Sequence, residues 1–412
     1  MFRNSNKRGR FALKPDLPAP SRERMIRRAA IGLGVAFFVF TVLLAEFVLR
    51  QVYAKKDEEI RQGMKLLSSP LYASIAAPGS EGKHRTPEFS VMLRANRLGF
   101  RDHDLDPDES VDIAFLGDSY VWGTGVEEDE RFTNLLQAAF PALRIANFGL
   151  CTAGTLNELV IWRDFVKQRR PKIAFLVFFP NDIQNNIWWL SSLRDVSSME
   201  IESAISARRQ MPVTWPDGEA IFRNNPYGSA LVHFLMTTYR GARLTVEKRL
   251  FPETEQVVLK KGGVVELGKE IVKGNSNWAP AVDLLLPAVE KGWSLTRTAL
   301  EMLADETKAD GARLVVVYLP YQERIHPRHW AERKKMFAIV VPDAIVNFDR
   351  PRERLHSIAG RLGVEFIDLT PSLLTATQGT DKPLYYPIDG HLTPLGHRIV
   401  FETLKQWLSR NS

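Results

Sequence analysis

Two short segments near opposite ends of the chain carry residues that could perform nucleophilic chemistry together. Ser119 follows an apolar run in the segment IAFLGDSYVWGTG, which predicts a sharp turn between a strand and a helix with the hydroxyl exposed. Asp389 and His391 stand two residues apart in the segment YYPIDGHLTP, and side chains at this spacing in an extended loop can point the same way. A carboxylate beside a histidine can hold its tautomer and stabilise the imidazolium that forms when it takes a serine proton. The three residues are therefore candidates for a Ser–His–Asp triad.

The turn around Ser119 differs from the nucleophile elbow of α/β-hydrolases. Gly117-Asp118-Ser119-Tyr120 lacks the second glycine of the G-x-S-x-G pattern. Taken alone, the segment is also compatible with an ordinary helix N-cap, because Asp and Ser are both common at that position.

Two further segments contain groups that could bind a negatively charged oxygen. The glycines and small residues of IANFGLCTAGTLNE allow backbone N–H groups to face a ligand at the start of a helix. Asn181 follows a third apolar run in FFPNDIQNN, where its side-chain amide could donate to a developing oxyanion. An Asn-Asp pair is equally typical of a plain turn, so the segment indicates a site only in combination with the others.

The pattern of apolar runs predicts the elements that position these segments. Strands are expected at Val111–Leu116, Arg144–Phe148, Lys172–Phe179, Arg313–Leu319 and Val364–Leu369. Helices are expected at Phe132–Phe140, Leu156–Lys167, Trp293–Lys308, Arg352–Leu362 and Pro394–Leu408. Near-continuous apolar strands that alternate with helices predict a doubly wound α/β fold, with three α/β/α layers around a five-stranded parallel sheet. Such folds bind ligands at the carboxyl ends of the strands, where three of the segments begin.

The alternation stops after the third strand, over an insertion at about 185–288. An insertion that leaves this edge of a sheet could form a lid or a substrate-binding element, or it could be a subdomain that only packs. Trp188 and Trp189 could stack on sugar rings, although tryptophans are more often buried. The insertion also contains Trp215 and the basic stretch RLTVEKRLF.

The N-terminal part of the chain predicts a membrane anchor. A basic tail at 1–28 is followed by the apolar segment Ala29–Leu49, which contains a single charge, Glu46. About 20 apolar residues in a helix span the hydrocarbon core of a bilayer. A buried core helix and a cleaved signal peptide are alternatives, but the run is apolar all round and no small-x-small cleavage pattern follows. The positive-inside rule places the tail in the cytoplasm and the rest outside it. Residues 50–86 are expected to form a helical stalk up to about Leu67 and then a Pro-, Gly- and Ser-containing linker, Ser68–Thr86.

Charge and cysteine content narrow the function classes. Of the net charge of +7, all is carried by the tail, since the remaining chain has 46 basic and 46 acidic residues. A neutral body lacks the basic surface that nucleic-acid binding requires, so no nucleic-acid partner is expected. Cys151 is the only cysteine, which excludes an internal disulfide. His326 and His329 lack surrounding ligands for a metal site, and His397 is expected to pack or cap the last helix.

The order of these segments resembles the SGNH (GDSL-like) hydrolase superfamily, over roughly Val111–Leu408 without the insertion. The segment NRLGFRD (Asn96–Asp102) before the first strand is similar to membrane-anchored bacterial members, which often act near cell-surface polysaccharide pathways. The hydrolase-like domain is accordingly expected at 87–412.

The resemblance assigns a role to each segment. It makes Ser119 the nucleophile, His391 the general base and Asp389 the residue that orients it. The backbone N–H of Ser119, the Asn181 side chain and an N–H of the second segment would form the oxyanion hole. The sequence departs from the family pattern at two places. The last segment has one spacer residue fewer than the usual Asp-x-x-His. In the second segment, Thr152 stands where the family has a glycine, and Gly154 follows two residues later.

The resemblance implies a serine ester hydrolase that acts on ester-linked acyl groups, such as those of a cell-surface carbohydrate, without a cofactor. An O-acyltransferase of polysaccharide biosynthesis would use the same residues, with a sugar hydroxyl in place of water. A non-catalytic glycan-binding or assembly protein on the same scaffold is the third interpretation, motivated by Thr152. The expected location is the inner membrane, with the hydrolase-like domain periplasmic and polysaccharide biosynthesis proteins as partners.

Overall fold

The computed structural model covers the chain as two compact units, which are described separately. One comprises 1–58 with 220–240, and the other 59–219 with 241–412. The structure describes residues 21–106, 109–190, 196–214, 234–235, 238, 254–258, 264–378 and 380–411. The predicted tail up to residue 20, Trp215 and the stretch RLTVEKRLF lie outside these ranges.

The first unit contains most of helix α1, Arg22–Gln62. Its segment Arg22–Val52 has a mean hydropathy of 2.4 in an 18-residue window, none of which is buried. A core helix of a soluble protein would bury such a window, so this helix is long and apolar enough to cross a membrane. Glu46 forms an ion pair with Arg50 one turn later, with Oε1 2.8 Å from Nε. The helix continues through the first part of the predicted stalk.

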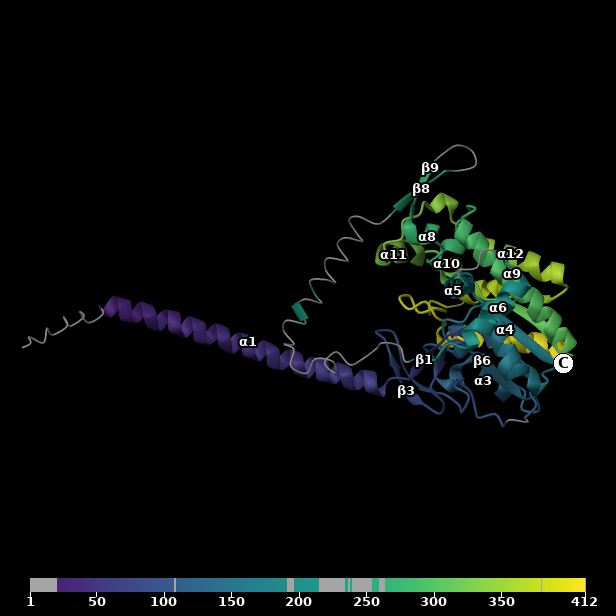
Figure 1. Ribbon diagram of the computed structural model, residues 1–412, viewed down its shortest axis with the longest axis horizontal. Coiled ribbons are helices and arrows are strands. Elements are labelled where there is room, and N and C mark those ends of the chain that lie inside the picture. Colours follow the sequence, from purple (N-terminus) through teal and green to yellow (C-terminus); the bar gives the residue numbers. More distant parts are fainter. Residues whose placement is uncertain are drawn as a thin grey trace, which may run out of the picture. The chain divides into compact units, whose positions relative to one another are not determined.

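The second unit is built on a five-stranded parallel sheet in the order β11-β10-β7-β5-β6. Figure 1 labels β6, a strand at one edge of this sheet. Its strands are β5 (Ile113–Gly117), β6 (Ile145–Gly149), β7 (Ile173–Phe178), β10 (Arg313–Tyr318) and β11 (Glu365–Asp368). Each coincides with a predicted strand to within a few residues, and every adjacent pair is parallel. The predicted sheet is confirmed.

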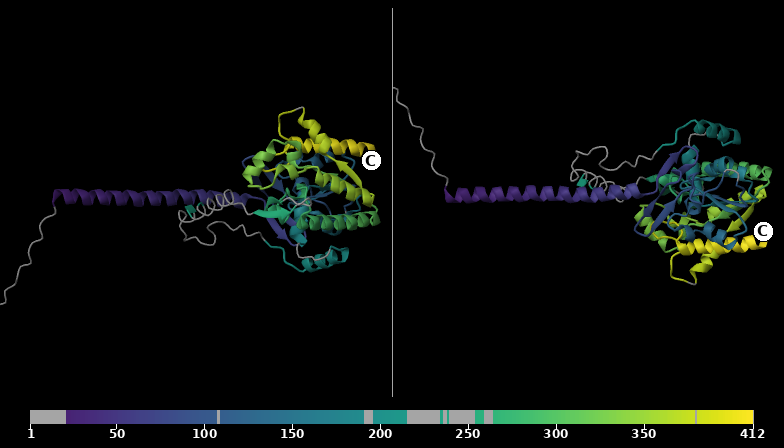
Figure 2. Two further views of the ribbon diagram at one scale, coloured as in Figure 1. Left: turned by 90° about the horizontal axis from the view of Figure 1, so that it is seen from above. Right: turned by 90° about the horizontal axis from the view of Figure 1, so that it is seen from below.

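Two helical layers cover the sheet. Phe115 and Val177 point into a core shared with α3 (Phe132–Ala139), α13 (Thr370–Thr377) and α14 (Pro394–Asn411). Their neighbours Leu116 and Leu176 point into the opposite core, shared with α4 (Thr155–Ile161), α9 (Pro287–Ala309) and α12 (Arg350–Leu362). In the left view of Figure 2, α14 in yellow and α9 in green lie on opposite sides of the sheet. The three-layer α/β/α architecture therefore follows from strands that are buried on both faces.

The strand order creates a crevice at one end of the sheet. From β5 the chain first adds β6 on one side and then returns to add β7 on the other. The helices that follow β5 and β7 therefore leave toward opposite faces, which opens a crevice between the carboxyl ends of these two strands. The residues that come directly after β5 and β7 border this crevice.

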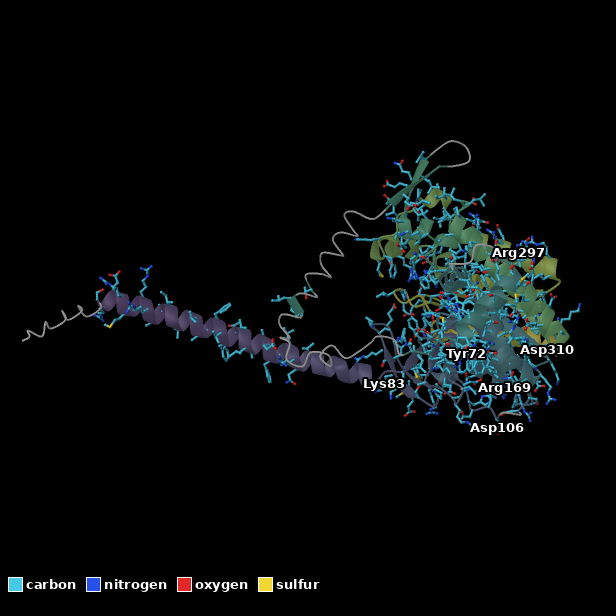
Figure 3. The ribbon with its side chains drawn as sticks, in the orientation of Figure 1. Tyr72, Lys83, Asp106, Arg169, Arg297 and Asp310 are labelled. Atoms are coloured by element: carbon cyan, nitrogen blue, oxygen red, sulfur yellow. The ribbon has the colours of Figure 1, made fainter. Side chains whose placement is uncertain are left out.

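The predicted linker Ser68–Thr86 is wrong, because the segment forms strands. Strand β1 (Leu66–Ser69) pairs with β2 (Ala73–Ala76), and β3 (Glu81–Arg85) pairs with β4 (Ser90–Arg94), both antiparallel. Pro70, Pro78 and Gly79 lie in the turns between these short strands, whereas Gly82 lies within β3. Between β1 and β2, Tyr72 (labelled in Figure 3) donates from its hydroxyl to Asp164 Oδ2 at 2.8 Å.

The described parts of the insertion form separate small elements. They are α5 (Asn181–Leu190), α6 (Ser198–Arg209), β8 (Thr254–Val258), β9 (Val264–Gly268) and α8 (Lys269–Val272). Helix α5 packs closely on α9, where Gly292 leaves room for Ile183. Three further short helices follow strands of the sheet. Helix α2 (Ser119–Trp122) follows β5, whereas α10 (Gln322–Ile325) and α11 (His329–Met336) follow β10.

Replacing Gly292 by alanine tests the packing of α5 on α9. A Cβ at this position would lie 2.6 Å from Ile183 Cγ2 and 2.9 Å from Ile183 O, so the helices must separate. We expect Gly292→Ala to lower the free energy of unfolding by about 1–3 kcal/mol, measured by chemical denaturation. Gly360→Ala is the matched control, because this helical glycine has nothing within 4 Å of the new Cβ and should gain about 0.5–1 kcal/mol. Equal effects of the two substitutions would contradict the packing.

Candidate active site

The structure brings the three predicted triad residues together. Ser119 Oγ lies 2.7 Å from His391 Nε2, and His391 Nδ1 lies 2.5 Å from Asp389 Oδ1. His391 N also donates to Asp389 Oδ1 at 3.3 Å, which closes the two-residue spacing into a tight turn. Burial alone would raise the pKa of Asp389, but the hydrogen bond and charge of His391 hold it below its ordinary value. The shortened spacing therefore still permits a carboxylate–imidazole contact.

Ser119 begins a short helix directly after β5. Asp118 is the N-cap and accepts a hydrogen bond from Tyr120 N at 2.9 Å through Oδ1. The helix ends after four residues at Gly123, whose φ of +82° is a left-handed conformation that favours glycine. Tyr120 donates from its hydroxyl to Gly390 O at 2.8 Å, so the serine turn is bonded directly to the loop that carries His391.

Two buried arginines hold the turn that follows Ser119. The Arg101 guanidinium donates to Gly123 O at 2.5 Å and to Val126 O at 2.7 Å. Arg131 donates to Trp122 O at 3.2 Å and also to Arg101 O. Burial lowers the pKa of both arginines. The segment Asn96–Asp102, singled out in the sequence, thus serves to fix the backbone beyond the serine.

Two backbone N–H groups are available as oxyanion donors. Ser119 N and Thr152 N donate to no acceptor within the described part of the chain. Both residues line the same cavity. Thr152 has a φ of +62°, which is unfavourable for a residue with a Cβ, and a hydrogen bond to Ser74 Oγ at 3.1 Å holds its side chain. The expected strained conformation at the family's glycine position is therefore present.

Gly154 does not supply an oxyanion donor, which corrects one of the two alternatives from the sequence. Its N–H donates to Asn157 Oδ1 at 3.0 Å, and the residue is the buried N-cap of α4. The loop instead presents Thr152 to the cavity. Of these two residues, only Thr152 has a backbone N–H without an acceptor in the described part of the chain.

Asn181 begins α5 at the end of β7 and lines the cavity together with Ser119. Its amide also lies beside Asp118, which is fully buried. Burial raises the pKa of Asp118, and the hydrogen bond from Tyr120 N opposes this rise. The other carboxyl oxygen of Asp118, Oδ2, has no hydrogen-bond partner among the described residues.

A set of buried carboxyl groups lies behind this surface. Glu158 and Asp182 are completely buried, and none of their four carboxyl oxygens has a hydrogen-bond partner among the described residues. Burial, and then the charge of Asp118, raises the pKa of Glu158 well above its ordinary value. Burial, and then the charges of Glu158 and Asp118, raises the pKa of Asp182 as well. Burial of these two carboxyls therefore favours their neutral, protonated form.

The cavity in front of the triad has a volume of about 400 Å³. Trp278, Tyr321 and Phe179 line it with aromatic surface, whereas Glu323 and Arg333 line it with charge. Glu323 accepts a hydrogen bond from Trp278 Nε1 at 2.9 Å and forms an ion pair with Arg333 at 2.9 Å. The site thus combines apolar and polar surface within reach of one nucleophile.

The two adjacent tryptophans of the insertion differ in exposure. Trp188 lines the cavity with 55% of its surface exposed, and its indole N–H donates to Asn275 Oδ1 at 3.2 Å. Trp189 is 8% exposed and donates to Pro70 O at 2.6 Å, with the Arg208 guanidinium over its ring. Only Trp188 is placed to contact a ligand.

Several residues of the site are not predicted by the sequence. Two of them come from the β3–β4 hairpin. Glu88 contacts the Asp389 loop, and His84 lines the cavity. Arg333 donates to Pro387 O at 3.0 Å and Ile388 O at 3.1 Å from α11. Nothing in their local sequence marks them, because each acts through a long-range contact. The segment that contains His84 resembled a linker.

The other residues considered in the sequence lie outside the triad. His397 stacks on Phe132 at 5.7 Å, and burial lowers its pKa to about 3, in keeping with a packing role. His326 accepts a hydrogen bond from Leu384 N at 3.4 Å, and no cluster of three metal-ligating side chains occurs among the described residues. Cys151 lines the cavity, and burial raises its pKa to about 12, which keeps it a thiol.

The buried carboxyl of Glu158 predicts a pH dependence of stability. Its folded pKa lies above the ordinary 4.5, so the folded state binds an extra proton, and stability is lost as pH rises above about 4.5. Glu158→Gln removes the titrating group. Between pH 5 and pH 8 the free energy of unfolding should therefore fall less in the variant than in the wild type, and the difference should be at most about 1.4 kcal/mol per pH unit. Denaturant unfolding at each pH measures it, with Glu301→Gln, an exposed glutamate on α9, as control. Parallel curves for wild type and Glu158→Gln would contradict a protonated Glu158.

Part of the chain matches a model of a known protein family. Residues 271–411, which include Asp389 and His391 but not Ser119, match the family described as the SGNH hydrolase-like domain of the acetyltransferase AlgX. No curated protein matches the chain.

Three solved structures are similar to the chain at low identity. TesA is 10% identical with a TM-score of 0.35, covering 71% of this chain and 96% of its own. An acetylxylan esterase from Geobacillus stearothermophilus is 12% identical with a TM-score of 0.34, covering 73% and 95%. An alpha/beta hydrolase from the metagenome of Lake Arreo is 12% identical with a TM-score of 0.35, covering 72% and 94%. The family match covers residues 271–411 alone, and the five-stranded parallel sheet of the second unit has the architecture predicted from the sequence.

Proposed function

We propose that this protein is a membrane-anchored, extracytoplasmic serine esterase that acts on ester-linked acyl groups, with Ser119, His391 and Asp389 as its catalytic triad. The observation that supports this most strongly is the pair of short contacts at His391: Nε2 lies 2.7 Å from Ser119 Oγ, and Nδ1 lies 2.5 Å from Asp389 Oδ1. This geometry suits a general base that takes the serine proton.

The reaction proceeds through an acyl-enzyme. Ser119 Oγ attacks the acyl carbonyl carbon while its proton moves to His391 Nε2, and Asp389 stabilises the resulting imidazolium. The tetrahedral intermediate collapses, the bond to the alcohol breaks, and His391 returns the proton to the leaving oxygen. Water then attacks the acyl-enzyme with His391 as base, which releases the acid and restores the serine hydroxyl.

Three donors stabilise the oxyanion in this scheme: the N–H groups of Ser119 and Thr152 and the side-chain amide of Asn181. Both N–H groups lack an acceptor within the described residues, and all three residues line one cavity. The strain at Thr152 supports a functional reason for the conformation, because an unfavourable φ costs on the order of 1–3 kcal/mol and persists only where the surroundings enforce it.

The natural substrate is an acylated carbohydrate of the cell surface. The exposed Trp188 indole offers a flat apolar surface for a sugar ring, while the exposed Asn277 lines the same cavity with an amide group that can bond hydroxyls. Proteins that assemble or export such polysaccharides are the proposed partners.

O-acyl transfer is the second candidate function. It is favoured by the match of residues 271–411 to a domain of an acetyltransferase. Transfer uses the same acyl-enzyme, with a sugar hydroxyl as the attacking group in place of water. A purely non-catalytic glycan-binding role is less well supported, since it would not require the ordered contacts at His391.

Helix α1 anchors the enzyme to the inner membrane, with the basic tail in the cytoplasm and the hydrolase-like domain in the periplasm. The apolar length of Arg22–Val52 and the nine basic residues before Ala29 support this orientation.

Substitution of Ser119 tests the enzyme directly. The full-length protein in detergent micelles should hydrolyse a short-chain nitrophenyl ester, and Ser119→Ala should lower kcat by at least about 10³-fold. A serine-reactive phosphonate should label wild type at Ser119. Ser409→Ala is the control, because the Ser409 hydroxyl donates only to Lys405 O on α14. If wild type neither turns over the ester nor reacts with the phosphonate, the catalytic proposal fails. Adding a sugar acceptor and assaying its acylated product distinguishes transfer from hydrolysis.

Asn181→Ala tests the oxyanion hole. Loss of one side-chain donor should lower kcat about 10²–10³-fold with little change in KM, because the amide bonds the oxyanion rather than the ground-state carbonyl. Steady-state kinetics of the same ester measure both constants. An unchanged kcat would remove Asn181 from the oxyanion hole and leave the two backbone donors.

A further inference from the structure

The loop that carries Asp389 is bonded to a carboxylate from the other end of the hydrolase-like unit. Glu88 accepts a hydrogen bond from Asp389 N at 2.6 Å, and its two oxygens lie 3.0 and 3.2 Å from Ile388 N. Bonds from N–H groups to a carboxylate at these lengths are the stronger, charge-assisted kind. Resting on the function proposed above, we propose that Glu88 is the positioning residue of the triad: it orients Asp389 toward His391.

The peptide groups before Asp389 are held from two directions. Glu88 binds the N–H groups of Ile388 and Asp389, while Arg333 binds the carbonyls of Pro387 and Ile388 at 3.0 and 3.1 Å. The backbone at Asp389 sets the direction of its Cα–Cβ bond, and hence where its carboxylate lies. Because only Gly390 separates Asp389 from His391, the loop has little freedom of its own to correct a misplaced carboxylate.

The Glu88 side chain has no role in forming its own hairpin. The β3–β4 turn is closed by Thr86, whose N–H donates to Phe89 O at 2.9 Å and whose hydroxyl accepts from Glu88 N and Phe89 N at 3.2 Å. Phe89 packs on Tyr386 with ring centroids 5.0 Å apart, which docks the turn on the loop. The carboxylate of Glu88 is therefore free to bind the Asp389 backbone.

The hairpin is also fixed to the segment that follows helix α1. Lys83 of β3, labelled in Figure 3, forms a parallel bridge with Gly63, the residue after the helix ends. A Cβ at Gly82 would lie 2.3 Å from the carbonyl carbon of Gly63, so the two backbones are in direct contact. The hairpin that carries Glu88 is thus held by backbone contacts at its other end as well.

Kinetics of the full-length chain in detergent test the inference. Glu88→Ala should lower kcat for the nitrophenyl ester about 10–100-fold, with KM and the unfolding temperature nearly unchanged, because a base displaced by about 1 Å loses activity on this scale. Glu88→Gln, which keeps one accepting oxygen, should retain more activity. Glu81→Gln is the matched control: Glu81 lies on the same hairpin, is 65% exposed and faces only Arg94 at 3.7 Å.

A double substitution separates positioning from a general structural effect. In the Asp389→Asn background, Glu88→Ala should change kcat by no more than about twofold, because two residues that act through one contact are not additive. If the two substitutions lower kcat independently, so that their effects multiply, the proposal is overturned. It is also overturned if Glu88→Ala only reduces the amount of folded protein and leaves kcat unchanged when the active sites are counted by phosphonate titration.

A measurement that does not depend on catalysis separates the positioning role of Glu88 from the proposed esterase activity. The proton shared between His391 Nδ1 and Asp389 should give a low-field ¹H resonance in the wild type and in Glu81→Gln, and Glu88→Ala should weaken or shift it. That pattern in a chain without esterase activity would support the positioning role and reject only the proposed function. A resonance that is absent from wild type, or unchanged in Glu88→Ala, overturns the positioning role itself.

Discussion

The hydrogen bond between Ser119 Oγ and His391 Nε2 joins two parts of the chain that are 272 residues apart, and the architecture of the site depends on it. Neither side can move alone without breaking this contact. The serine turn is held by the carboxyl end of β5 and by Arg101, whereas the histidine loop is held by Tyr120, Arg333 and Glu88. A 2.7 Å contact between two loops requires that both be fixed by groups other than the contact itself.

The sheet topology explains why polar groups can gather at this edge. At the crevice between β5 and β7, the first turns of α2 and α5 present N–H groups that the sheet does not use. The second segment reaches the same point only by adopting an unfavourable conformation at Thr152. The surrounding structure compensates for this cost with the hydrogen bond to Ser74, from a hairpin outside the central sheet.

Several buried arginines and carboxyl groups lie near the turn that carries Ser119. Arg101 and Arg131 are almost completely buried and donate to backbone carbonyls, and Asp118, Glu158 and Asp182 are fully buried. Buried polar groups that find partners make a structure rigid, while burial of carboxyls without partners favours their protonated form. The turn of Ser119 therefore rests on groups that disfavour hydrated or loosened alternatives. Such rigidity suits an oxyanion hole, which gains its effect from donors that are already in place.

Local pattern predicted the parallel sheet and the membrane-compatible helix. The resemblance carried by the order of the short motifs predicted Ser119, Asp389, His391 and Asn181 as a set. Apolar strands, turn residues and short motifs are properties of neighbouring residues, so they are visible without a fold. Tertiary structure decided the rest. It forms strands within Ser68–Thr86, since short polar strands gain their stability from pairing. It also occupies the Gly154 N–H with Asn157, while the Thr152 N–H has no acceptor among the described residues. Glu88 and Arg333 became part of the site only through contacts with a loop hundreds or tens of residues away, which no local pattern encodes.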